Sequence, residues 1–204
     1  MTTRERFATL VVDMQNDFVV DEGVLAQSGK DNSSAKQIVP CVRELVEFSR
    51  AQGVPVIWIK MIYDSAEDVG VLLERSPFYK EGGLRRNSWG AELVESLEVK
   101  DGDYVIEKKR FSAFFNTKLD ELLKELGVTH LLVAGVRTDF CVESTVRDAF
   151  FRDYRVLVVK DCVAGYVPDL HENAIRTMGT VFSSIMSLAE IKEALARKSA
   201  PTSA

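Results

Sequence analysis

Three side chains that can take part in nucleophilic catalysis follow short apolar runs typical of buried strands. Asp13 follows FATLVV, Lys108 follows YVIE, and Cys141 lies a few residues after HLLVA. In open parallel sheets, ligands bind beyond the carboxyl ends of the strands, so we expect these side chains to meet at one edge of a sheet. A carboxylate, an ammonium and a thiol at one edge are suited to attack on a carbonyl group.

Cys141 is the candidate nucleophile. Thr138 or Asp139 can cap the helix that follows, which would put the sulfur at the helix N-terminus, where unpaired N–H groups and the helix dipole favour a thiolate. The alternative is that Cys141 is a small buried hydrophobic residue. That structural interpretation is the one we adopt for Cys41, inside a predicted helix, and for Cys162, after a predicted strand.

Asp13 is the candidate acid–base group. It opens DMQNDF directly after a buried run, where an ionised carboxylate needs a partner or a raised pKa. Lys108 can be that partner, although residues 108–110 (KKR) also fit a solvated charged run. A turn or capping role explains Asp17 in the same stretch.

Two other motifs are disfavoured. The spacing of Cys141 and Arg147 (CVESTVR) is that of a phosphate-binding thiol phosphatase loop, but Glu143 would repel the anion and the loop has no glycine. We therefore expect Arg147 on a helix surface. The glycine pattern of dinucleotide binding is absent.

The elements that must position these residues alternate along the chain. Buried strands are predicted at 7–12, 54–63, 104–107, 130–134, 155–160 and 181–185. Helices are predicted from Ser33 or Ser34 through the apolar positions of 38–48, and at 117–126, 139–152, 169–178 and 188–196. Such alternation predicts an α/β fold with a parallel sheet covered on both faces.

Residues 64–102 are the irregular part, rich in glycine and mixed charge, and we expect a lid or an interface there. Residues 198–204 (KSAPTSA) are predicted to be a flexible tail. The remainder, residues 1–197, fits a single domain.

Composition narrows the classes of partner. The chain has 204 residues with 46% hydrophobic and 28% charged residues, and its net charge of -5 gives no basic footprint for nucleic acid or anionic membranes. No apolar run reaches the roughly 18 residues of a membrane span and nothing marks export, so we expect a cytoplasmic protein. Three cysteines do not form a fully paired disulfide framework.

Histidine is scarce. With only His130 and His171, which we interpret as structural or solvent-facing, a multi-histidine metal site is impossible, and we expect no metal or organic cofactor.

The segments LVVDMQNDF, VIEKKRFSAFFNTKLDELL and LLVAGVRTDFCVESTVRDAF resemble the three signature blocks of the isochorismatase-like cysteine hydrolases, in order and spacing, and the resemblance covers nearly the whole chain. It implies a three-layer α/β/α sandwich with a six-stranded parallel sheet, in a homo-oligomer, either a dimer or a tetramer. It also implies that Asp13 is the general base and acid, Lys108 the ammonium that keeps it ionised, and Cys141 the nucleophile.

The same resemblance implies further site residues. A cis peptide is expected at Val136–Arg137, with the backbone N–H groups of Arg137 and Cys141 as an oxyanion hole; Arg137 departs from the small residue usual there. Phe18 matches a position that lines the substrate site.

Three more residues are candidates for the pocket. Trp89, in the expected lid, is an aromatic wall candidate beside Phe18, and ordinary core packing is the alternative for both. Arg110 and Arg137 are candidates to bind a substrate carboxylate, which would favour an anionic ureide such as ureidoacrylate over neutral biuret.

The subclass follows from two differences. True isochorismatases have glycine where Cys141 stands, and nicotinamidases carry metal-binding histidines where this chain has MIYDSAEDVG. What remains is the metal-free amidohydrolases; RFSAFFNTKLD and CVESTVRDAFF are similar to ureidoacrylate amidohydrolases, with biuret and N-carbamoylsarcosine hydrolases as neighbours. We therefore predict hydrolysis of a C–N bond in a small amide, carbamoyl or ureido compound through a thioester. The alternatives are a nicotinamidase-type or isochorismatase-type hydrolase, or a non-catalytic small-molecule binding protein.

Overall fold

The apolar, β-branched runs form one parallel sheet in the computed structural model, which describes residues 5–199. The strands are β1 (Phe7–Val12), β2 (Val56–Met61), β3 (Tyr104–Lys108), β4 (His130–Val136), β5 (Arg155–Ala164) and β6 (Ser184–Met186). Their order across the sheet is β3-β2-β1-β4-β5-β6, and every pairing is parallel. The predicted six-stranded parallel sheet is confirmed.

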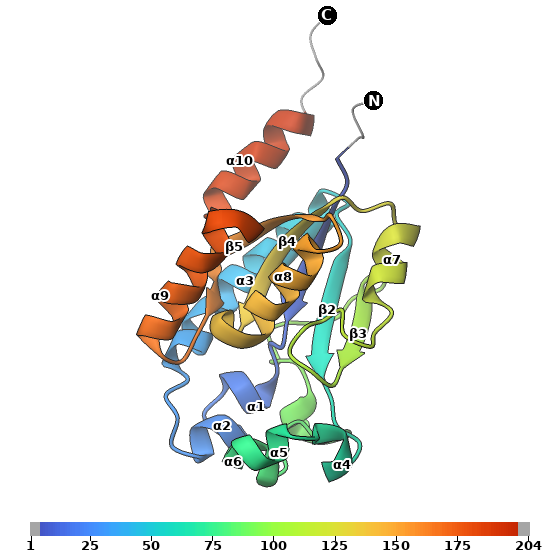
Figure 1. Cartoon of the computed structure of the whole chain (residues 1–204). Coiled ribbons are helices and arrows are strands. Elements are labelled where there is room, and N and C mark those ends of the chain that lie inside the picture. The colour runs from blue at the N-terminus through green and yellow to red at the C-terminus, as the bar shows by residue number, and fades with distance from the viewer. Residues whose placement is uncertain (1–4, 200–204) are drawn as a thin grey trace, which may run out of the picture.

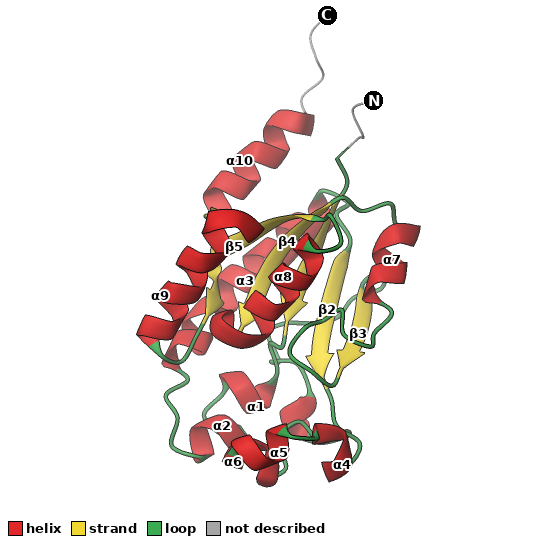
Figure 2. Ribbon diagram, viewed as in Figure 1, coloured by secondary structure: helices red, strands yellow, loops and turns green. Residues whose placement is uncertain are grey.

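Helices cover both faces of this sheet (Figure 1). They are α1 (Asn16–Val19), α2 (Val24–Gln27), α3 (Ser33–Ala51), α4 (Ala66–Val69), α5 (Leu72–Arg75), α6 (Pro77–Lys80), α7 (Leu119–Glu125), α8 (Glu143–Phe150), α9 (Pro168–Thr177) and α10 (Leu188–Ser199). In Figure 2, α3 lies behind the sheet and α8 in front of it. The wholly buried strand β4 lies between these two layers, which explains why its sequence is almost continuously apolar.

The strand order reverses between β1 and β4. The chain runs outward from β1 through β2 to β3 and then returns to the other side of β1, so the connections after β1 and β4 diverge to opposite faces. Such a switch point is where open α/β sheets bind their ligands. Asp13 directly follows β1, and the segment of Cys141 directly follows β4.

Backbones approach closely at this switch point. Gly135 pairs with Val12 across β4 and β1, and it has a φ of 113°. A Cβ atom on Gly135 would lie 2.0 Å from the carbonyl oxygen of Val12, so the site requires glycine. The strand ends that carry Asp13 and Cys141 are thereby held next to each other.

Residues 64–102 lie beyond the carboxyl ends of the strands. Their short helices α4, α5 and α6 are seen below the arrowheads of β2 and β3 in Figure 1, in the same layer as α1 and α2. We call residues 64–102 the lid segment below, and their role as a lid or an interface stays a prediction.

Some predicted bounds were wrong. The last strand begins at Ser184 because residues Met178–Phe182 continue the preceding helix as a π-helical turn. β5 extends to Ala164, four residues beyond the prediction, and α10 continues to Ser199. The rest of the predicted tail, 200–204, lies outside the described residues. None of the described helices is both long and apolar enough for a membrane crossing.

Candidate active site

The ammonium of Lys108 joins the three predicted side chains. Its Nζ lies 2.7 Å from Oδ2 of Asp13, 3.4 Å from Sγ of Cys141 and 3.2 Å from the carbonyl oxygen of Arg110. The three N–H groups of a protonated lysine therefore have three acceptors. The side chains of Asp13 and Lys108 are fully buried, so this is a desolvated ion pair and not part of a solvated charged run.

Asp13 is held at the strand end by its backbone. Its N–H donates to the carbonyl oxygen of Ile59 on β2 (2.9 Å), and its φ of 53° is in the left-handed region, where aspartate is one of the few tolerated side chains. One carboxylate oxygen, Oδ2, accepts from Lys108, whereas Oδ1 is buried and accepts no hydrogen bond. Oδ1 is thus the oxygen available to a reacting group.

Burial decides the protonation states of the three groups. Burial raises the pKa of Asp13, and the positive charge of Lys108 opposes this rise. For Lys108, burial acts to lower the pKa, but the charges of Asp13 and Cys141 outweigh it and raise the pKa. The lysine therefore stays an ammonium, and its charge favours the ionised form of Asp13.

The thiol of Cys141 differs from our expectation. Cys141 lies inside a π-helical turn, Thr138–Val142, one turn before α8, and neither Thr138 nor Asp139 caps the helix with its side chain. Burial raises the pKa of Cys141, and the charge of Asp13 raises it further, while Lys108 lowers it. The expected side-chain cap from Thr138 or Asp139 is therefore absent, and desolvation outweighs the charges that favour a thiolate, so the resting group is a thiol.

Local contacts fix the turn that carries Cys141. The Val136–Arg137 peptide is cis, as the resemblance implies. The hydroxyl of Thr145 donates to the carbonyl oxygen of Cys141 (2.7 Å) and accepts from the N–H of Ala113 (3.0 Å), which ties this turn to the loop after β3. The turn that carries Cys141 and the loop that follows Lys108 are therefore linked through one buried threonine.

The pocket candidates lie in different surroundings. Phe18 is buried and stacks on Phe78 from the lid, with 5.2 Å between ring centroids. Trp89 is 55% exposed and lines an open groove with Val20 and Leu93, so its role as a wall stays a prediction.

The two candidate arginines already have protein partners. Nη2 of Arg137 lies 2.7 Å from Oδ2 of Asp139, and its guanidinium lies over the rings of Phe140 and Tyr166. Nη1 of Arg110 donates to the carbonyl oxygens of Asp68 (2.8 Å) and Lys109 (2.6 Å), which leave its charge uncompensated.

The sequence did not reveal the tyrosines around the site. The hydroxyl of Tyr63 lies 3.2 Å from Sδ of Met61 and 3.3 Å from the carbonyl oxygen of Lys109, and Tyr79 packs edge-on against it. Burial raises the pKa of both phenols, and the charges of Cys141 and Asp13 add to this rise. The alternation of side chains along the predicted strand 54–63 puts Tyr63 on the same face as Met61, which is a signal in the sequence. Tyr79 has no such signal, because it lies in the segment 64–102.

The acidic stretch after β2 is neutralised by cations of the chain itself. Lys109 Nζ lies 2.8 Å from Oδ2 of Asp64 and 2.5 Å from Oδ2 of Asp68, and Arg86 bonds Asp64 and Glu107. Within residues 5–199, no group of three or more histidine, cysteine or acidic residues has the geometry of a metal site.

The histidines and Arg147 are engaged elsewhere. Nδ1 of His130 lies 2.8 Å from the hydroxyl of Thr129, and Nδ1 of His171 lies 2.9 Å from that of Thr138. Arg147 pairs with Glu143 one turn away on α8, as expected for a helix surface.

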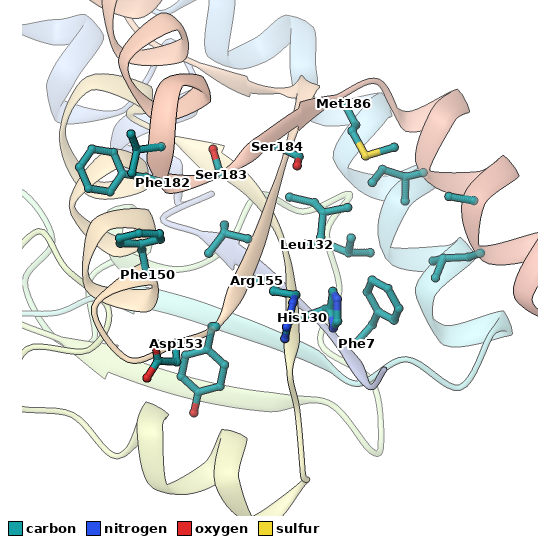
Figure 3. Close-up of a pocket in the computed structure, with 17 residues that line it drawn as sticks. Phe7, His130, Leu132, Phe150, Asp153, Arg155, Phe182, Ser183, Ser184 and Met186 are labelled. Atoms are coloured by element: carbon teal, nitrogen blue, oxygen red, sulfur yellow. The ribbon is translucent and has the colours of Figure 1, made fainter. Parts of the chain in front are cut away.

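A hollow lies at the end of the sheet opposite to Asp13, Lys108 and Cys141 (Figure 3). It has a volume of about 760 Å³ and is lined by residues at the amino ends of strands, among them Phe7, His130 and Arg155, and by Phe150 and Phe182. It contains none of the three clustered side chains, so it is separate from the Asp–Lys–Cys cluster.

The switch point and the Asp–Lys–Cys cluster together define an isochorismatase-like hydrolase. The model of the isochorismatase domain matches residues 7–190, and the chain belongs to this family. It is 39% identical to a probable inactive nicotinamidase of Arabidopsis thaliana, over 93% of this chain and 96% of that protein. It is 33% identical to the ureidoacrylate amidohydrolase RutB of Methylobacterium radiotolerans, over 91% of this chain and 78% of that protein.

A solved structure agrees with the fold. The crystal structure of a cysteine hydrolase from Pseudomonas syringae pv. phaseolicola has a TM-score of 0.87 at 26% sequence identity, covering 97% of this chain and 99% of that one. The predicted family and the prediction of a hydrolase are confirmed.

Proposed function

We propose that this hydrolase cleaves the C–N bond of a small amide, carbamoyl or ureido compound through a thioester on Cys141. The observation that carries the proposal is the buried arrangement in which Lys108 contacts both Asp13 and Cys141 while Oδ1 of Asp13 accepts no hydrogen bond. Similarity to a ureidoacrylate amidohydrolase supports the ureide class.

In the first half of the reaction, Oδ1 of Asp13 takes the proton of the Cys141 thiol. The sulfur then attacks the substrate carbonyl carbon, and a C–S bond forms as the carbonyl oxygen gains the negative charge. We propose that the backbone N–H groups of Arg137 and Cys141 bind this oxygen, a contact that is worth about 3 kcal/mol per donor. Asp13 returns the proton to the nitrogen, the C–N bond breaks, and ammonia or an amine leaves.

In the second half, Asp13 takes a proton from water as the water attacks the thioester carbon. The C–S bond breaks, and the proton passes to the sulfur, which restores the thiol. Lys108 holds its charge throughout, because the raised pKa keeps it protonated. Its role is to keep the buried carboxylate ionised and positioned.

A nicotinamidase-type reaction is the second candidate, because the relative from Arabidopsis thaliana is described as a probable inactive nicotinamidase. The ion pairs of Lys109 with Asp64 and Asp68 disfavour a metal-dependent version of that reaction, since they occupy the acidic groups next to the site. A non-catalytic binding protein on the same scaffold is the third candidate, and it predicts that changes at Cys141 leave its function intact.

The test is ammonia release from a panel of ureides, carbamoyl compounds and primary amides. We expect turnover of at least one ureide or carbamoyl compound, and a loss of about 10³-fold or more in kcat for Cys141→Ala and Cys141→Ser. Mass spectrometry of the quenched wild-type reaction should show the acyl group on Cys141. Near wild-type turnover by both variants would rule out the nucleophile, and preferential cleavage of nicotinamide would favour the second candidate.

Two sets of sequence predictions remain part of the proposal. Phe18 and Trp89 are wall candidates, and Arg110 and Arg137 are candidates for an anionic substrate group. The cytoplasmic location and the homo-oligomer, a dimer or a tetramer, also remain predictions, and sedimentation at a mass of 22.8 kDa would contradict the oligomer.

A further inference from the structure

Two buried side-chain atoms of the described residues have no hydrogen-bond partner. One is Oδ1 of Asp13, and the other is Nη1 of Arg85, in the lid. Unpaired buried polar atoms are rare in folded proteins, and each calls for an explanation such as a catalytic role or a bound water, ion or ligand. Oδ1 of Asp13 belongs to the proposed active site. If Nη1 of Arg85 faces that site as well, a bound substrate can explain both unpaired atoms.

Strand pairing places Arg85 on the face of the active site. The N–H of Tyr63 donates to the carbonyl oxygen of Leu84 (3.0 Å) and the N–H of Arg86 to that of Tyr63 (2.9 Å), so Tyr63 and Arg85 form a parallel bridge. Bridge partners direct their side chains to the same face. The Tyr63 hydroxyl contacts Met61, so this face is that of Met61.

Lys108 belongs to the same face. Met61 pairs with Lys108 in the register of β2 and β3, and the Lys108 side chain runs from there to Asp13 and Cys141. Arg85 therefore extends from the lid on the side of the sheet that carries the reacting groups.

Two neighbouring cations have carboxylate partners, whereas Arg85, like Arg110, has none among residues 5–199. Arg86 has the opposite orientation and bonds the carboxylates of Asp64 and Glu107, and Lys109 bonds Asp64 and Asp68. Arg85 makes no ion pair within the described part of the chain. The nearby exposed Glu67 on α4 has its pKa lowered mainly by Ser65 and only in part by the charge of Arg85.

The charge on the inner face is consequently unbalanced. Lys108 is compensated by Asp13, whereas the guanidinium of Arg85 has no carboxylate. Guanidinium groups bind carboxylates with two parallel hydrogen bonds, and the strength of this contact increases away from water.

The turn that carries Arg85 is held in place by the segment that carries Asp13. The N–H of Leu84 donates to Oδ2 of the buried Asp17 (2.7 Å), whose Oδ1 accepts from the N–H of Val24 (3.1 Å). A Cβ on Gly90 would collide with this carboxylate at 2.1 Å, so the lid packs tightly around Asp17. Asp17 thus fixes the distance between the lid turn and the DMQND segment.

We propose that Arg85 is the specificity-determining residue of the lid, and that it binds a carboxylate at the end of the substrate remote from the scissile C–N bond. The inference rests on the proposed function and narrows it to anionic amides or ureides. It also assigns the lid a role in substrate choice and not only in excluding water.

The test compares Arg85→Gln with Arg86→Gln, a matched change on the opposite face. The probes are 3-ureidopropionate and propylurea, which share the ureide and differ in the remote carboxylate. We expect Arg85→Gln to raise KM for the anionic ureide about tenfold or more, with kcat changed less than about threefold and the neutral ureide unaffected. Arg86→Gln should leave both substrates unchanged. Equal effects of Arg85→Gln on both probes would show a merely structural role and overturn the proposal.

Binding separates this inference from the proposed reaction. Calorimetry on Cys141→Ala protein should show binding of 3-ureidopropionate that weakens about tenfold when Arg85→Gln is added. If the anion does not bind but neutral amides are still hydrolysed through Cys141, the Arg85 assignment fails and the reaction stands. If the anion binds through Arg85 but nothing is hydrolysed, the reaction fails. Should Arg85→Gln not fold, Arg85→Lys keeps the charge and should retain binding weakened by less than the glutamine variant.

Discussion

Lys108 and Lys109 are adjacent in the sequence but belong to two different electrostatic regions. Lys108 lies on the inner face of the sheet, fully buried, with Asp13 as its ion-pair partner. Lys109 lies on the outer face in an exposed network with Asp64 and Asp68. One step along a strand reverses the direction of the side chain, and this step separates a reacting cluster from a surface network.

The difference teaches how this fold protects a charged group for chemistry. Burial makes the inner pair sensitive to the loss of either member, because the remaining charge would be left without water or a partner. Exposed pairs are screened by solvent and contribute little. In our proposal the inner face carries the function, and we expect the outer face to tolerate change.

The largest effect is expected for Lys108→Met, which removes the inner charge and keeps much of the volume. We expect a loss of about 10³-fold or more in kcat, with a smaller change in KM. Because Lys108 lowers the pKa of Asp13, its removal should raise that pKa and shift the acid limb of the rate profile to higher pH.

Lys108→Met should also lower the free energy of unfolding. The variant leaves Asp13 without its counter-ion, which costs about 3 kcal/mol or more for a buried pair at neutral pH. The cost should decrease as the pH falls and Asp13 takes up a proton. Urea unfolding at several pH values checks this, and an unchanged free energy of unfolding with full activity would remove the distinction between the two faces.

An intermediate effect is expected for Tyr63→Phe. The hydroxyl lies next to the carbonyl oxygen of Lys109, so it helps to hold the strand end that presents Lys108. We expect a loss of about 1 kcal/mol in stability and a fall in kcat of less than about tenfold. Tyr154→Phe is the control, because its hydroxyl bonds Asp120 far from the site; it should lose stability without losing activity. An equal loss of activity in both variants would contradict the positioning role.

The contrast also explains what the sequence could predict. Apolar runs identify the strands, and parallel connections bring the strand ends together, so Asp13, Lys108 and Cys141 were predictable as neighbours. The pattern KKR left open whether Lys108 is buried, because alternation alone does not say which face is covered. The degree to which burial raises the pKa of Cys141 was not predictable, since it depends on how completely the surrounding segments exclude water.

The lid was the least predictable part. The short helices between Ala66 and Lys80 have no long apolar period, and their packing depends on contacts with distant segments. Arg85 acquires its orientation only through the bridge to Tyr63, and its position only through Asp17. Neither contact has a local signature in the sequence, because the partners are more than twenty residues apart in one case and more than sixty in the other.

The smallest effect is expected for Lys109→Met on the outer face. Arg86 and, after it, Lys109 lower the pKa of Asp64, and Lys109 lowers that of Asp68. The contribution of Lys109 to stability is therefore present above the ordinary aspartate pKa of 3.8 and is lost as the pH falls through the lowered values. At pH 6 and low salt we expect Tm to fall by no more than about 2 °C, and kcat to change less than about twofold. The Tm difference from wild type should shrink below pH 3.8 and in 1 M salt, where the Debye length is about 3 Å. A large, salt-independent loss of activity would mean that the outer network acts on the site through the shared strand, and that the two faces are not separate.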